Sequence, residues 1–242
     1  TQGICLECLS KIIFSEEIKE DNPKVGFYSL FKGDKEEENK IDFFKDKEQA
    51  ETIEDYKDGK SFIGFMYADG DGLGDFLSKL KDKFVENNNE ADYKAFLKDF
   101  SVKLDAVTKD SLIQAMKELK HKFPIHKKEN GEERRYYGEF LIVGGDDVCG
   151  VFPADLVLEL SEKYQAIFEK EMYEYFEKSS EIYFGEVPKE KTNITTSSGV
   201  LIAKAKTPMY LLFNQSLKLQ KSAKKKRYDK FKGKINDKKH GY

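Results

Sequence analysis

Two adjacent aspartates interrupt an apolar run in the second half of this chain. The run, FLIVGGDDVCGVF, extends from Phe140 to Phe152, and its charged residues are Asp146 and Asp147. Apolar residues on both sides predict two β-strands, and the glycine pair before the aspartates permits the backbone to reverse. The stretch therefore predicts a β-hairpin whose turn presents two carboxylates at the edge of a sheet.

Taken alone, this GGDD sequence is equally compatible with an ordinary turn, because glycines permit positive φ and aspartates cap turns. A second acidic cluster favours a functional site. The segment YADGDGLGD, from Tyr67 to Asp75, places Asp69 and Asp71 after a predicted buried strand (61–68) and before a predicted amphipathic helix (75–86). Ligand sites in α/β sheets gather at strand–turn–helix junctions of this kind, where the helix N-terminus offers amides to an anion.

If the first strand and the hairpin are neighbours in one sheet, Asp69, Asp146 and Asp147 converge. Carboxylates in one place repel each other and are tolerated only beside positive charge. Hard oxygen ligands with open positions for phosphate suit Mg²⁺ or Mn²⁺. Two such ions about 3.5–4 Å apart clamp the attacking and leaving oxygens of a phosphoryl transfer. The constellation therefore indicates a two-metal site.

The rest of the chain predicts alternating strands and helices, in the order strand, helix, helix, strand, strand, helix, strand, helix. Their predicted ranges are 61–68, 75–86, 93–123, 136–143, 147–153, 155–176, 194–205 and 208–226. Pro208 is expected just inside the start of the last helix, and 126–135 is expected to be a polar loop. We divide the chain into a peripheral segment (1–60), one domain (61–226) and a basic, exposed tail (227–242), with nucleic-acid contact by the tail as the minor alternative.

Three ordered motifs resemble the palm domain shared by nucleotide polymerases and cyclases. ADGDGLGD on the first strand and GGDD on a hairpin are similar to motifs of the GGDEF-type cyclases and of the palm in the large subunit of type III CRISPR complexes. The third segment, TSSGVLIAKAKTPMYLLFNQSLKLQKSAKKK, resembles the CRISPR branch: a Ser–Ser–Gly strand start, then a Pro-initiated helix ending in Ala223 and Lys224. That branch includes stand-alone minimal CRISPR polymerases, and the resemblance extends from residue 61 to about residue 226.

This resemblance implies an α+β fold: a ferredoxin-like palm with a βαββαβ core, an antiparallel sheet with helices on one face, and inserted helices. It implies a nucleotidyl cyclase that converts ATP to a cyclic oligoadenylate or cyclic dinucleotide in antiviral defence. Asp69, Asp146 and Asp147 would be catalytic and would bind the two Mg or Mn ions, while Asp71 either ligates the second metal or only caps the helix. The nucleotide would also lie against Gly70, Gly72, Gly144, Gly145, Ser197, Ser198 and Lys224, of which Lys224 would hold the triphosphate.

Cyclisation requires two nucleotides facing each other, whereas one palm holds one. Either two copies pair as a homodimer, or this palm pairs with a second palm on another or a missing segment. A second hypothesis is a nucleotide-binding palm without turnover, acting as a subunit of an RNA-guided effector complex. A third is a template-dependent polymerase or primer-making enzyme.

The remaining features bound the class of protein. Cys5 and Cys8 form half of a zinc motif, which either is completed by ligands from elsewhere or is a pair of semi-buried thiols; Cys149 is expected in the core. A net charge of −3, despite 36% charged residues, argues against a protein that coats nucleic acid. No apolar run is long enough to span a bilayer and no signal-peptide pattern is present, so we expect a cytoplasmic protein without a membrane partner.

Overall fold

The computed structural model describes residue 56 and residues 60–86, 90–127, 131, 133–135, 137–183 and 194–239. The Cys5–Cys8 motif and almost all of the predicted peripheral segment lie outside the described residues, as do His240 and the last residues of the predicted tail. No helix within the described ranges is both long enough and apolar enough to cross a membrane.

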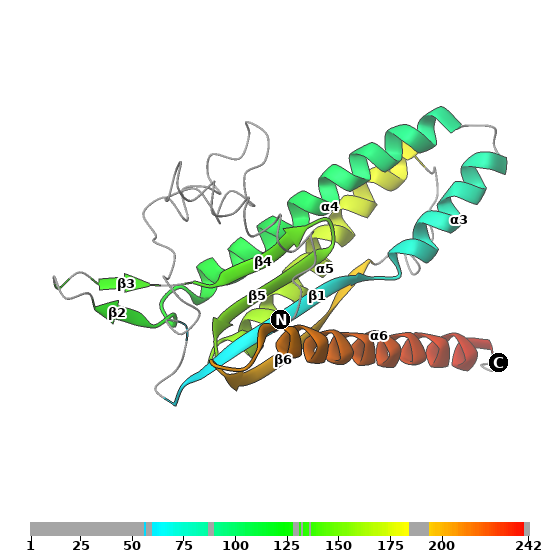
Figure 1. The fold of residues 1–242 in the computed structure, drawn as a ribbon. Coiled ribbons are helices and arrows are strands. Elements are labelled where there is room, and N and C mark those ends of the chain that lie inside the picture. Colours follow the sequence, from blue (N-terminus) through cyan, green and yellow to red (C-terminus); the bar gives the residue numbers. More distant parts are fainter. Residues whose placement is uncertain are drawn as a thin grey trace, which may run out of the picture.

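A four-stranded antiparallel sheet lies at the centre of the described chain (Figure 1). Its strands are β1 (Phe62–Asp71), β4 (Glu139–Gly144), β5 (Asp147–Pro153) and β6 (Thr195–Lys204), arranged in the order β4-β5-β1-β6. The first strand is therefore central, with the GGDD hairpin on one side and the last strand on the other. This is the ferredoxin-like topology, and the predicted α+β palm is confirmed.

The helices cover both faces of this sheet (Figure 1). Helices α3 (Leu73–Glu86), α4 (Glu90–Leu119) and α5 (Val157–Tyr183) contribute to the core on one face. Helix α6 (Met209–Lys239) packs against β6 and β1 on the other. The sequence predicted helices on one face of the sheet. Helices α3 to α5 lie on that face, whereas α6 forms an additional layer on the opposite face.

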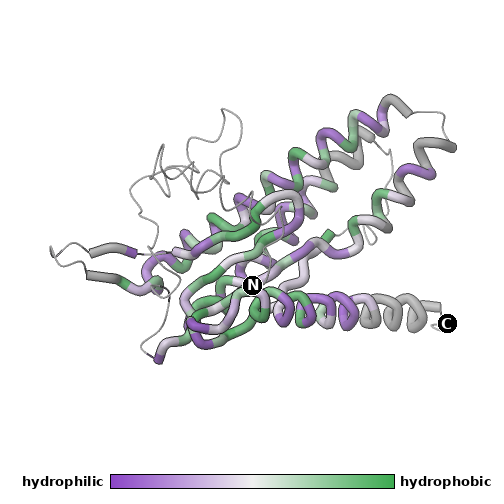
Figure 2. The backbone as a smooth tube through the Cα atoms, in the orientation of Figure 1, coloured by the Kyte–Doolittle hydropathy of each residue, from purple (hydrophilic) through white to green (hydrophobic). Residues whose placement is uncertain are grey.

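The alternation of side chains along β1 explains the two layers. Met66 and Ala68 point into the larger core with α4 and α5, whereas Phe65 and the partly buried Tyr67 point into the smaller core with Leu212 of α6. Because β1 is apolar on both faces, it is stable only when helices cover both. In Figure 2, hydrophobic segments follow the sheet strands, whereas the coloured part of α6 is largely hydrophilic after its first turns.

Several elements differ in extent or type from those predicted from the sequence. Strand β1 extends to Asp71, so Asp69 and Asp71 lie within the strand rather than in a turn. Part of the expected polar loop forms a short two-stranded ribbon of β2 (Ile125–Lys127) and β3 (Glu133–Arg135). Helix α6 begins after Pro208 and continues through the predicted tail to Lys239.

Candidate functional site

The end of β1 and the β4–β5 hairpin bring Asp69, Asp146 and Asp147 together. The register of β1 and β5 pairs Ala68 with Val148, so Asp69 and Asp147 are the next residues along the two strands. A Cβ built on Gly70 would lie only 2.8 Å from Asp146 Oδ2, which shows that the Asp146 side chain lies directly against this glycine. A larger residue at this position would displace the carboxylate.

Mutual repulsion is visible in the acid–base properties of the cluster. Burial raises the pKa of Asp146, and the negative charges of Asp69 and Asp147 raise it further. Burial also raises the pKa of Asp147; a hydrogen bond from Tyr67 opposes this shift, and the charge of Asp69 adds to it. Tyr67 donates its hydroxyl to Asp147 Oδ1 at 3.0 Å. The three carboxylates therefore behave as one electrostatic unit that favours a nearby cation.

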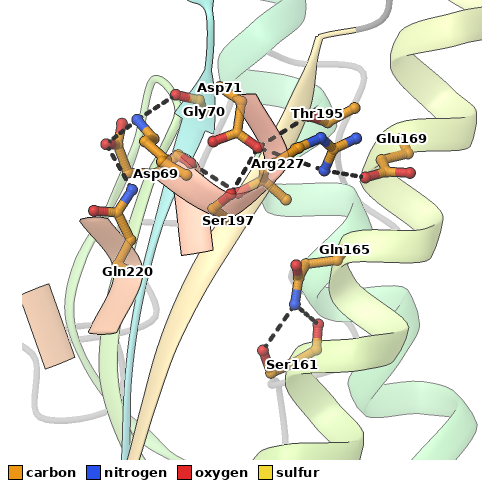
Figure 3. Close-up of polar contacts among 12 residues, drawn as sticks. Asp69, Gly70, Asp71, Ser161, Gln165, Glu169, Thr195, Ser197, Gln220 and Arg227 are labelled. Carbon is orange, nitrogen blue, oxygen red and sulfur yellow. Dashed lines mark hydrogen bonds and ion pairs between the residues drawn. The ribbon is translucent and has the colours of Figure 1, made fainter. Parts of the chain in front are cut away.

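In this structure the nearby cation is a lysine of α6. Lys224 Nζ donates to Asp69 Oδ2 and, at 2.6 Å, to the carbonyl oxygen of Gly70. Gln220 Nε2 donates to the same Asp69 oxygen at 3.1 Å (Figure 3). The charge of Lys224 also lowers the pKa of Asp147, although burial outweighs it. Lys224, which the resemblance assigned to the triphosphate, thus binds the Asp69 carboxylate and the Gly70 carbonyl, two groups that would hold a metal ion.

Close packing of α6 on β6 places these side chains. A Cβ on Gly199 would overlap the carbonyl oxygen of Ser216 and would lie 2.7 Å from the backbone nitrogen of Gln220. The backbone of α6 therefore packs directly on the strand. Ser216 and Gln220 are fully buried at this contact. Gly199 was identified in the sequence only as part of the third motif, and its physical role is this close approach.

Asp71 lies in a separate polar network with residues of β6, α6 and α5 (Figure 3). Its Oδ2 accepts hydrogen bonds from Thr195 at 2.9 Å and from Ser197 at 2.8 Å. Arg227 lies 3.5 Å from the same oxygen and also pairs with Glu169 of α5 at 2.9 Å. These contacts tie Asp71 to β6 and α6. Its Oδ1 is buried and has no hydrogen-bond partner among the described residues.

The turn of the GGDD hairpin is held by two side chains of α4. Thr108 Oγ1 donates to the Gly145 carbonyl at 2.6 Å, and the Gly145 amide donates to Asp105 Oδ1 at 3.0 Å. Lys109 in turn pairs with Asp105 at 2.6 Å. Gly145 has φ +61°, which favours glycine. We call Asp105 and Thr108 the turn clamp. The sequence analysis did not predict it, although the i, i+3 spacing of Asp105 and Thr108 places two polar side chains on one face of the helix.

The other predicted site residues are distributed around this centre. Gly72 has φ +71° at the junction between β1 and α3, and its carbonyl accepts the first hydrogen bond of that helix, from Phe76 at 2.9 Å. Gly144 ends β4 and faces Asp105, whose Oδ1 would lie 3.5 Å from an added Cβ. Cys149 is fully buried, as expected, and burial raises the pKa of its thiol to about 12.

Ser197 and Ser198 point to different places. Ser197 faces Asp71, whereas Ser198 lines a groove of about 560 Å³ between α5 and α6. In this groove, Gln165 Nε2 donates to the Ser161 hydroxyl at 3.1 Å and to the Ser161 carbonyl at 3.2 Å (Figure 3). The Ser198 hydroxyl oxygen is buried without a hydrogen-bond partner in the described part of the chain. The two serines therefore do not form one subsite.

No group of three or more His, Cys, Asp or Glu side chains within the described ranges is arranged ready for a metal ion. The carboxylates converge, but Asp69 is turned toward Lys224 and Gln220. A metal would therefore have to compete with the Lys224 ammonium for Asp69.

Comparisons with known proteins identify the fold family. A family model described as Cas10/Cmr2, second palm domain, matches residues 62–232. Among solved structures, the chain is similar to Csm1 in T. onnurineus (19% identity, TM-score 0.47), covering 72% of this chain and 22% of that one. It is also similar to the apo Csm1–Csm4 cassette (17%, TM-score 0.44, 68% and 19% covered) and to that cassette in complex with cA4 (18%, TM-score 0.46, 68% and 20% covered).

The chain thus spans about a fifth of the length of the solved structures that it matches. The search among curated proteins gave no match.

Proposed function

Because the chain belongs to the family of Cas10/Cmr2 second palm domains, we propose that it is a metal-dependent nucleotidyl cyclase of CRISPR-type antiviral defence. A ribose hydroxyl of one ATP attacks the α-phosphate of another, the bond to pyrophosphate breaks, and successive steps give a cyclic oligoadenylate or cyclic dinucleotide. The observation that carries the proposal is the convergence of Asp69, Asp146 and Asp147, where burial and the charges of its two neighbours raise the pKa of Asp146.

The donor set suits Mg²⁺ or Mn²⁺, because carboxylate and carbonyl oxygens are the ligands that these ions prefer. Asp69, Asp146 and Asp147 would hold two ions together with the carbonyl of Gly70, and the ions would neutralise charge on the attacking and leaving oxygens. Asp71 remains a candidate ligand through its Oδ1, which is buried without a hydrogen-bond partner among the described residues. Its Oδ2 is already engaged by Thr195 and Ser197.

The other side chains would position the nucleotide. Lys224 is the cation nearest to the carboxylates and would turn from Asp69 to the triphosphate. Gly72 and Gly145 present open backbone, with nothing within 4 Å of an added Cβ, where a phosphate or ribose would lie close. The space beside Gly70 is taken by Asp146, and Gly144 faces Asp105, so these two glycines would contact the nucleotide only if those side chains moved. Ser198 offers its hydroxyl to the base or ribose, and Ser197 would act through Asp71. Catalysis would come mainly from positioning and charge neutralisation.

The decisive experiment incubates the purified chain with each nucleoside triphosphate and Mg²⁺ or Mn²⁺. Pyrophosphate release and phosphatase-resistant product are followed, the latter by mass spectrometry. We expect cyclic adenylate from the wild type, none from Asp146→Ala/Asp147→Ala, and wild-type product from Asp155→Ala, an exposed aspartate outside the cluster. Linear, template-dependent product, or equal product from the double variant, would contradict the proposal.

The alternative function is a nucleotide-binding palm that works only within an RNA-guided effector complex. It is favoured by one observation: the chain spans about a fifth of the length of the Csm1 structures that it matches. In that case ATP binds in a metal-dependent manner and the Asp146→Ala/Asp147→Ala variant loses this binding, but the isolated chain releases no pyrophosphate. Zinc at Cys5 and Cys8 stays a prediction, tested by metal analysis of the purified chain.

A further inference from the structure

One helix of this protein carries a large excess of positive over negative charge. Helix α6 contains eleven lysine or arginine residues and two aspartates, whereas the net charge of the whole chain is −3. The remainder of the chain is therefore strongly acidic, and α6 is a basic element on an acidic body. Such segregation of charge indicates a surface for a polyanion rather than a uniformly solvated exterior.

The two sides of α6 have different tasks. Its inward side carries the buried Ser216 and Gln220, and its cations there are engaged: Lys224 with Asp69, and Arg227 with Asp71 and Glu169. Its outer side carries the exposed residues Lys218, Lys221, Lys225 and Tyr228, which we call the outer stripe. Helical spacing of three, four and three residues places them on one line along the helix.

The outer stripe has charges that no other described residue neutralises. Lys218, Lys221 and Lys225 form no ion pair with another described residue. The same spacing continues in the sequence to Lys232 and Lys239 at the end of the helix. The side chain of Tyr228 is 55% exposed, so an aromatic ring lies at the surface next to these lysines.

We infer that the outer stripe of α6 binds single-stranded nucleic acid. Lysines repeated along one line complement a phosphate backbone, and an exposed aromatic ring among them is suited to stack on a base. A lipid surface fits less well, because an interfacial helix requires an apolar face, and the apolar face of α6 is packed on the sheet. The stripe lies opposite the acidic cluster, so this inference does not rest on the proposed catalysis.

The test compares two charge-matched triple variants of the full chain. Lys218→Glu/Lys221→Glu/Lys225→Glu removes the outer stripe, and Lys94→Glu/Lys98→Glu/Lys120→Glu makes the same charge change at exposed positions on and beside α4. Binding of a fluorescent 20-nucleotide single-stranded RNA is measured by anisotropy over a series of salt concentrations. Circular dichroism checks that both variants fold, and Asp146→Ala/Asp147→Ala is measured in parallel to separate this binding from the catalytic site.

We expect the outer-stripe variant to bind the RNA at least tenfold more weakly than the wild type. The slope of log Kd against log salt concentration should decrease by about 2, because each of the three lost phosphate contacts accounts for roughly 0.7 of the slope. The α4 variant should keep most of the affinity and the wild-type salt dependence. Tyr228→Ala should weaken single-stranded binding about fivefold or more without changing the salt dependence, because stacking is not a charge effect.

Three outcomes would overturn the inference. Equal loss in both triple variants would mean that only net charge matters. Wild-type affinity in the outer-stripe variant would place any binding elsewhere. Tighter binding to anionic phosphatidylserine vesicles or to polyglutamate than to RNA would assign the stripe to a membrane or to an acidic protein.

Discussion

Burial of Asp146, together with its repulsion from Asp69 and Asp147, makes the stability of this fold depend on pH. The pKa of Asp146 lies above its ordinary value of 3.8, so the folded state holds this proton more tightly than the unfolded chain does. The contribution of Asp146 to folding stability is therefore most favourable below that ordinary value and is lost as the pH rises through the folded-state pKa. A neutral side chain of the same shape should remove this loss.

We therefore predict that Asp146→Asn stabilises the metal-free protein at neutral pH. The melting temperature should rise by about 2–4 °C for each kcal/mol of repulsion removed, and the advantage should shrink as the pH is lowered toward 3.8. Thermal unfolding in a chelating buffer between pH 4 and about 8 measures this. Asp155→Asn, at an exposed position, is the control. An Asp146→Asn protein that is less stable than wild type at every pH would refute the repulsion argument.

Lys224 should affect metal and nucleotide in opposite directions. In Lys224→Gln, Asp69 loses its cation, so Mn²⁺ alone should bind a few times more tightly. Binding of ATP should weaken about tenfold or more, because a charge-assisted contact to the triphosphate is lost. Calorimetric titrations with Mn²⁺ and with ATP measure both, and Lys225→Gln, its exposed neighbour, should change neither. A parallel loss of both affinities would mean that Lys224 only holds the site together.

The hairpin and α4 behave as one unit through the turn clamp. Thr108→Val removes the hydroxyl that donates to the Gly145 carbonyl at 2.6 Å and leaves that acceptor without this partner. We expect about 1–2 kcal/mol lower unfolding free energy and weaker Mn²⁺ binding, because the carboxylates next to Gly145 are less well fixed. Thr108→Ser keeps the hydroxyl and should restore both. Denaturant unfolding and Mn²⁺ titration are the measurements; loss of stability without loss of metal affinity would make the clamp purely structural.

The contact between α6 and β6 depends on Gly199. Gly199→Ala would drive a methyl group into the Ser216 carbonyl, and a backbone atom cannot move aside as a flexible side chain does. We predict a loss of about 1–3 kcal/mol in stability and weaker ATP binding, since Gln220 and Lys224 move with the helix. Gly74→Ala is the matched control: nothing lies within 4 Å of its added Cβ, and in α3 the change should be neutral or stabilising. Equal effects of the two changes would contradict this account of α6.

The sequence predicted those parts of the site whose residues are close together along the chain, and it missed contacts between residues that are far apart in the sequence. The acidic pairs were recognised because their signals are local: apolar runs end at Asp69 and at the GGDD turn. The turn clamp was missed because Thr108 contacts a carbonyl 37 residues away, and Gln220 because its partner lies 151 residues away. Patterns in one chain report helix faces and strand ends, but not which polar side chain of one element reaches another.

The whole described chain forms one palm, and this limits what it can do alone. The sheet order β4-β5-β1-β6 occurs once among the described residues, and the acidic cluster lies at one end of β1. A ring of nucleotides requires a second nucleotide facing the first. If the proposed cyclase acts as a homodimer, its active form therefore contains two copies, whereas a palm from a longer protein would require that protein.

We predict that pyrophosphate release per chain rises with protein concentration and levels off when the dimer is saturated. A tenfold excess of Asp146→Ala/Asp147→Ala should then lower the activity per wild-type chain, because most wild-type copies pair with a defective one. The same excess of Asp155→Ala, changed at an exposed position, should not lower it. Activity per chain that is constant over a hundredfold dilution, and unaffected by the defective variant, would show that one palm suffices. No turnover at any concentration, with ATP bound, would leave the partner-dependent palm as the function of this chain.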